Sequence, residues 1–167
     1  MKDAGIQPGD SVVLTGHSLG GIDAAGLATN KQFQQLYSVD ALTTFGAPVG
    51  GFEFSENTSV MAVEHHDDMV PPLDGVANPD GENRSTVRVD TQYNGQYSTV
   101  GSLSGVAAHD MYTYTLGAQG ISNSGHAAVE KHEHALRAAV PAGSDANTET
   151  YIYEATEEHV VHNPEDR

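Results

Sequence analysis

Apolar residues along the chain gather in short blocks separated by amphipathic or small-residue stretches. Blocks with the length and β-branched content of strands, the last with edge character, lie at Val12–Thr15, Ala41–Phe45, Ser59–Glu64 and Ser85–Asp90. The stretches between them favour helices at Leu19–Ala28 and Lys31–Tyr37. This alternation predicts a mostly parallel sheet of about four strands joined by crossover helices.

The second half of the chain has a less regular pattern. Asp74–Arg84 contains Asp-Gly and Asn-Pro pairs, which predict a solvated loop. Residues 91–108 are rich in Gly, Ser, Thr and Tyr and predict another loop, whereas Ala127–Ala139 fits a final helix. Beyond Pro141 the chain turns polar and acidic, which predicts a mobile tail over residues 141–167.

Composition narrows the range of partners. The 167 residues suffice for one domain that buries about two thirds of its unfolded surface. The 23 acidic residues against 7 lysines and arginines give a formal net charge of -16, which opposes binding to nucleic acids and to anionic membranes. The chain has no cysteine, and no apolar run reaches the length of a membrane span or a signal-peptide core. The cellular compartment stays open.

The apolar run at residues 12–14 leads into Gly-His-Ser-Leu-Gly, followed by a small-residue segment. A G-x-S-x-G sequence between a strand and a helix is typical of a nucleophile elbow, a sharp turn that exposes a serine hydroxyl. Gly16 and Gly20 are expected to leave room around this turn. Ser18 is therefore the candidate nucleophile, and the Leu19 N–H at the start of the helix is a candidate oxyanion donor.

A serine nucleophile needs a histidine base and an acid that orients the histidine. In strand–elbow–helix hydrolases, these residues follow in the order serine, acid, histidine. The strand at residues 59–64 runs into acids and a proline turn, which brings Asp68 to a strand end. His109 follows at a loop-to-helix junction, so order and spacing suggest a triad of Ser18, Asp68 and His109.

Three local motifs resemble those of the α/β-hydrolase superfamily, most closely its class 3 lipases. They are Gly-His-Ser-Leu-Gly-Gly at 16–21, Thr-Phe-Gly-Ala-Pro at 44–48 and Asp-Met-Val-Pro at 68–71. His109 followed by Tyr112 is also similar to the family's His-x-x-Tyr pattern. The resemblance covers roughly residues 10–117 and implies hydrolysis of carboxylic esters through an acyl-enzyme, without a cofactor.

The largest departure from this family lies ahead of the elbow. A complete α/β-hydrolase has several strands before its nucleophile strand and a loop that donates a second oxyanion N–H, whereas 17 residues precede Ser18 here. We therefore expect residues 1–140 to form the C-terminal half of an α/β-hydrolase domain, as in an N-terminally truncated fragment, a chain with a downstream start or a severely minimised hydrolase. An exposed strand edge is expected to favour self-association.

The expected function is that of a serine ester hydrolase, either an esterase or a lipase, acting on a small-molecule or lipid ester. His109 takes the proton of Ser18, Asp68 orients His109, and Leu19 holds the oxyanion. Two alternatives stay open. One is a non-catalytic hydrolase remnant or interaction module, and the other is an acyltransferase that uses the same elbow.

The cluster of His65, His66, Asp67 and Asp68 is a weak metal candidate. Successive strand residues point to opposite faces and cannot all converge on one ion, so no metal is predicted. The acids of residues 74–84 lack the spacing of a calcium loop.

The remaining histidines and tyrosines have less specific interpretations. His126, His132 and His134 lie near the last predicted helix, where residues two apart do not share a face, and a solvated surface is expected. His17 is expected to fill space beside the nucleophile. For Tyr112 and Tyr114, an acyl pocket and a place in the core are equally open.

Overall fold

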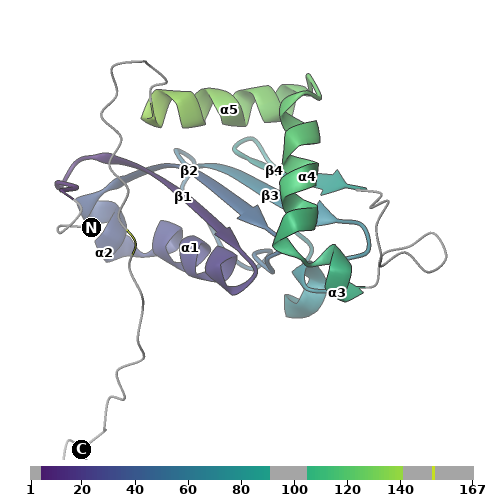
Figure 1. Cartoon of the computed structure of the whole chain (residues 1–167). Helices are drawn as coiled ribbons and strands as arrows, with labels where there is room; N and C mark the ends of the chain where they lie inside the picture. Colours follow the sequence, from purple (N-terminus) through teal and green to yellow (C-terminus); the bar gives the residue numbers. More distant parts are fainter. Residues whose placement is uncertain (1–4, 91–104, 141–151, 153–167) are drawn as a thin grey trace, which may run out of the picture.

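A parallel sheet with helices packed against it forms the described part of the chain (Figure 1), which in this computed structural model comprises residues 5–90, 105–140 and 152. Its strands are β1 (Ser11–His17), β2 (Ser38–Phe45), β3 (Ser59–His65) and β4 (Arg84–Val89). They pair in the order β1-β2-β3-β4, and every pair is parallel. This arrangement confirms the predicted α/β fold and brings the carboxyl ends of all four strands to one edge of the sheet.

Helices cover both faces of this sheet. They are α1 (Leu19–Thr29), α2 (Lys31–Leu36), α3 (Gly105–Ala108), α4 (Met111–Ser122) and α5 (Ala127–Ala139), with a 3-10 turn, η2, at Pro71–Asp74. Figure 1 shows α1 and α2 below the sheet and α5 above it. Within residues 5–90 and 105–140, every helix is too short or too polar to cross a membrane.

The alternation of side chains along β3 explains why its sequence is continuously apolar. Val60 and Ala62 pack into the cluster that contains the alanines of α1. Met61 and Val63 pack into a second cluster with residues of α4 and α5. Because successive strand residues point to opposite faces, a strand covered on both sides needs apolar residues at every position.

Two details of the coarse sequence prediction change. Residues 105–108 were expected in a loop but form α3, while residues 91–104 lie outside the described residues. The expected solvated loop at Asp74–Arg84 is wrong at Asn78 and Arg84, which are buried. The Arg84 guanidinium donates to the carbonyls of Val49 and Phe52 and to Asn78 Oδ1, so it satisfies buried acceptors from a neighbouring loop.

The edges of the described sheet are β1 and β4. Because β1 is an edge here, the expected self-association through an exposed strand edge stays a prediction. The division into a domain at 1–140 and a mobile tail at 141–167 also stays a prediction, since nearly all of that tail lies outside the described residues.

Candidate active site

Ser18 occupies the sharp turn between β1 and α1. Its backbone has φ 56° and ψ -126°, and it is the one non-glycine residue with positive φ in the described ranges. The Ser18 N–H donates to the Phe45 carbonyl at 2.9 Å, which ties the turn to the end of β2. Such geometry costs about 1–3 kcal/mol and persists only where the surrounding structure enforces it.

The turn is tightly packed at two glycines. A Cβ at Gly16 would collide with the Gly20 carbonyl, and a Cβ at Gly21 would come within 2.5 Å of the Ala47 Cβ. A Cβ at Gly20 would meet no other atom within 4 Å. The expected room around the elbow is therefore required at Gly16 and Gly21, whereas Gly20 contributes its backbone carbonyl to the close approach.

His109 lies between α3 and α4 and contacts both other members of the predicted triad, Ser18 and Asp68. Its Nε2 is 2.8 Å from Ser18 Oγ, and its Nδ1 is 2.9 Å from Asp68 Oδ2. Since a carboxylate only accepts, Nδ1–H donates to Asp68, and this tautomer leaves the Nε2 lone pair to accept from the Ser18 hydroxyl. The structure thus brings the three residues together in a continuous hydrogen-bonded chain.

The carboxylate of Asp68 is fully buried. Its Oδ1 accepts from the Val70 N–H at 2.8 Å, and its Oδ2 accepts from the Tyr114 hydroxyl at 2.6 Å as well as from His109. Buried charge is tolerated when its lone pairs are satisfied in this way. Burial and the bond to Asp68 raise the pKa of Tyr114, which keeps its hydroxyl protonated and able to donate.

The start of α1 presents backbone donors beside Ser18. The Ser18 carbonyl accepts from the N–H groups of Gly21 and Ile22, at 2.9 and 3.3 Å. For the N–H groups of Leu19 and Gly20, the described residues provide no acceptor. Free N–H groups in the first turn of a helix attract negative charge, so this position can hold an oxyanion.

In a comparison with known protein families, the model of the family described as lipase (class 3) matches residues 5–77. This segment belongs to the class 3 lipases, an α/β-hydrolase family. Membership implies a hydrolase of the lipase or esterase type. The matched segment contains Ser18 and Asp68, whereas His109 lies outside it. No curated protein and no solved structure was found to match the chain.

Several large apolar side chains near the three site residues in sequence are exposed. They follow Ser18 and Asp68 in sequence or flank His109, and we call them the apolar rim: Leu19, Met69, Leu73, Val106, Met111 and Tyr112. The Met69 side chain lies against Gly105 at the start of α3, which links the turn after β3 to the segment that carries His109. Exposed apolar surface that is contiguous and rimmed by polar residues is typical of a binding surface.

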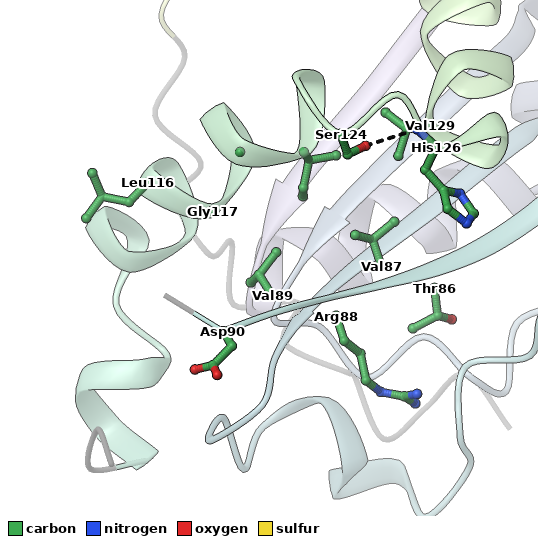
Figure 2. Close-up of a pocket in the computed structure, with 12 residues that line it drawn as sticks. Thr86, Val87, Arg88, Val89, Asp90, Leu116, Gly117, Ser124, His126 and Val129 are labelled. Atoms are coloured by element: carbon green, nitrogen blue, oxygen red, sulfur yellow. Dashed lines mark hydrogen bonds between the residues drawn. The ribbon is translucent and has the colours of Figure 1, made fainter. Parts of the chain in front are cut away.

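A cleft of about 660 Å³ lies away from this site, between β4 and the helices α4 and α5 (Figure 2). Figure 2 shows Val87 and Val89 pointing from β4 toward the helices, with Arg88 on the other side of the strand. As far as the described residues define its lining, the cleft includes none of Ser18, Asp68 and His109.

Other histidines show one departure from the sequence analysis. His132, expected on a solvated surface, is buried between α5 and the sheet, where its ring nitrogens bond Thr43 Oγ1 at 2.8 Å and Ser59 Oγ at 2.9 Å. His126 and His134 are exposed. Among residues 5–90 and 105–140, no group of three or more histidines and acids is placed to hold a metal ion.

The sequence analysis gave no role to the bond from Tyr114 to Asp68. The family's His-x-x-Tyr pattern points to Tyr112, but Tyr112 is more than half exposed and Tyr114 is buried against Asp68. Of the two open interpretations of Tyr114, the core is correct. Spacing could not have found it, because Tyr114 lies five residues after His109 and outside the three- or four-residue spacing at which helix residues share a face.

Proposed function

We propose that this protein is a serine carboxylic ester hydrolase in which Ser18 is the nucleophile, His109 the general base and acid, and Asp68 the residue that orients His109. One observation carries the proposal. Ser18 Oγ, both ring nitrogens of His109 and Asp68 Oδ2 form one hydrogen-bonded chain with links of 2.8 and 2.9 Å. This is the arrangement that makes a serine hydroxyl nucleophilic at neutral pH.

The reaction proceeds in two halves. Ser18 Oγ attacks the ester carbonyl while its proton passes to His109 Nε2, and the carbonyl oxygen becomes an oxyanion held by the Leu19 N–H. His109 then protonates the leaving alcohol, which leaves an acyl group on Ser18. Water repeats the sequence, with His109 taking its proton, and releases the acid. Asp68 offsets the positive charge that His109 carries in each transition state.

We further propose esters with an apolar acyl or alkyl part as substrates. Leu19 and Met69, about two thirds exposed, directly follow two of the proposed triad residues, and Val106, Met111 and Tyr112 flank His109 in sequence. An apolar chain bound there would cover surface that now faces water, which is favourable by roughly 25 cal/mol per Å² of buried apolar area.

A fluorophosphonate that carries an alkyl chain tests the nucleophile. We expect a single adduct in the intact mass of the protein, located on Ser18 by peptide mapping, and its loss in Ser18→Ala. Ser124→Ala is the matched control, because Ser124 is also a serine in the sequence neighbourhood of a histidine but lies in the cleft of Figure 2. An adduct that persists in Ser18→Ala contradicts the proposal.

Turnover distinguishes hydrolysis from the two alternatives. We expect p-nitrophenyl esters to be hydrolysed, with a higher kcat/KM for butyrate than for acetate because of the apolar rim. A labelled protein that releases p-nitrophenol only when a second alcohol is present would be an acyltransferase. Absence of both label and turnover in a folded protein would identify a non-catalytic module.

A further inference from the structure

His17 is the last residue of β1 and makes a contact that the proposed mechanism does not use. Its Nε2 lies 2.8 Å from the backbone carbonyl oxygen of His109. Because a carbonyl only accepts, the proton is on Nε2 and His17 donates. The His17 ring also faces the His109 ring, with centroids 4.8 Å apart and planes tilted by 31°, and it lies 5.6 Å from the Tyr114 ring.

This contact falls where the backbone of His109 lacks regular helical support. His109 stands between the last turn of α3 and the start of α4, whose N-cap is Asp110. Its N–H donates to the Gly105 carbonyl at 3.2 Å, which ties it to a helix of only four residues. The bond to the His109 carbonyl comes instead from His17, at the end of the strand that leads into Ser18.

We propose that His17 is a positioning residue that holds His109 over Ser18 through this N–H donation, an inference that rests on the proposed function. Two links then set the 2.8 Å separation of Ser18 Oγ and His109 Nε2. Ser18 is covalently adjacent to His17, and the His109 backbone is hydrogen-bonded to the His17 ring. The base and the nucleophile are thereby both held by the end of β1. A misplacement of catalytic groups by about 1 Å can cost about a hundredfold in rate.

Packing alone would give a different dependence on the side chain. Phenylalanine at position 17 keeps an aromatic ring against His109 and Tyr114 but has no donor. Glutamine removes the ring but places an amide N–H near the position of Nε2. If donation matters, Gln retains function and Phe loses it, and if ring contact matters, the order reverses.

The test compares His17→Phe and His17→Gln with the wild type. We expect His17→Phe to lower kcat for p-nitrophenyl butyrate, and the rate constant of fluorophosphonate labelling, by roughly 10- to 100-fold while KM changes little. His17→Gln should retain most of both rates. Thermal unfolding of all three proteins shows whether any rate loss reflects unfolding. Equal loss in both variants, or no loss in His17→Phe, overturns the proposal.

A second readout does not depend on activity. The proton on His109 Nδ1, donated to Asp68, should give a downfield imidazole signal in proton–nitrogen NMR spectra, assigned by its loss in His109→Asn. We expect the signal to broaden through water exchange in His17→Phe and to persist in His17→Gln. Absence of the fluorophosphonate adduct at Ser18 in the wild type would contradict the proposed hydrolase. An unchanged signal from the His109 Nδ1 proton in His17→Phe would instead contradict the positioning role of His17.

Discussion

The Tyr114 hydroxyl donates at 2.6 Å to Asp68 Oδ2, the same carboxylate oxygen that accepts from His109 Nδ1. The hydroxyl also accepts from the backbone N–H of His65 at 3.0 Å. Gly46, with φ 59°, lies against both groups, and a Cβ there would come within 2.8 Å of Oδ2 and 2.9 Å of the hydroxyl. Helix α4 therefore helps to fix the orientation of the Asp68 carboxylate through the Tyr114 hydroxyl.

Tyr114→Phe should lower both stability and turnover. It removes a donor from a buried carboxylate and leaves the buried His65 N–H without this acceptor, which costs about 1–3 kcal/mol in the free energy of unfolding. The freed carboxylate should also orient His109 less well, so we expect kcat for ester hydrolysis to fall by roughly tenfold or more. Urea unfolding and steady-state kinetics measure the two effects.

Tyr112→Phe is the matched control for this change. Tyr112 lies two residues earlier on α4 and is 56% exposed, so loss of its hydroxyl should change the free energy of unfolding by no more than about 0.5 kcal/mol. A larger effect in Tyr112→Phe than in Tyr114→Phe would show that the hydroxyl on Asp68 does not support the site.

The two neighbouring acids after β3 should differ sharply in their effect on turnover. Asp68 is bonded to His109, whereas the backbone N–H of Asp67 donates to His65 Nδ1 at 3.1 Å. Asp68→Asn should lower kcat by about 10⁴-fold, the scale seen when a triad acid loses its charge, because the amide favours the wrong tautomer of His109. Asp67→Asn should cost less than tenfold. The reverse order in a kinetic comparison would move the acid by one residue.

The parallel sheet of about four strands could be predicted from the sequence because local patterns determine its elements. The continuous apolar run at residues 60–63 reflects burial of β3 on both faces, and the elbow sequence reflects a turn that admits only glycine at Gly16. Strand ends in a parallel sheet meet at one edge, so the proximity of Ser18 and Asp68 followed from the predicted alternation.

Tertiary contacts account for what the sequence did not predict. His132 was expected on a solvated surface because histidines two apart on a helix do not share a face, yet its ring bonds the hydroxyls of Thr43 and Ser59 on adjacent strands. Arg84 looked like the end of a polar loop, but it bonds carbonyls more than 30 residues earlier in the chain. Neither partner has a fixed spacing from the residue it binds.

Burial of His132 should make the protein less stable in mild acid. Burial lowers the pKa of His132 to about 4, against an unfolded value of about 6.5. Above pH 6.5 the imidazole is neutral in both states and contributes no pH dependence. Between pH 6.5 and pH 4, His132 is protonated in the unfolded chain but neutral in the folded protein. The free energy of unfolding therefore falls by about 1.4 kcal/mol for each unit by which the pH is lowered in this range.

His132→Gln should remove that contribution. Urea unfolding at several pH values between 4 and 8 should give a shallower loss of stability for His132→Gln than for the wild type, even if the variant is less stable at pH 8. His134→Gln is the control, because His134 is exposed on the same helix and should leave the slope unchanged. Parallel curves for His132→Gln and the wild type would show that His132 titrates normally in the folded protein.

Adjacent glycines in the first turn of α1 should respond oppositely to alanine. Gly20→Ala adds a methyl group to open space inside a helix and should raise the free energy of unfolding by up to about 1 kcal/mol, because alanine loses less backbone entropy than glycine. Gly21→Ala forces a Cβ to 2.5 Å from the Ala47 Cβ and 3.2 Å from the Gly16 carbonyl. Overpacking of this kind costs about 1–3 kcal/mol, so urea unfolding should separate the two variants clearly. If Gly21→Ala is as stable as Gly20→Ala, the elbow is not packed against the segment that follows β2.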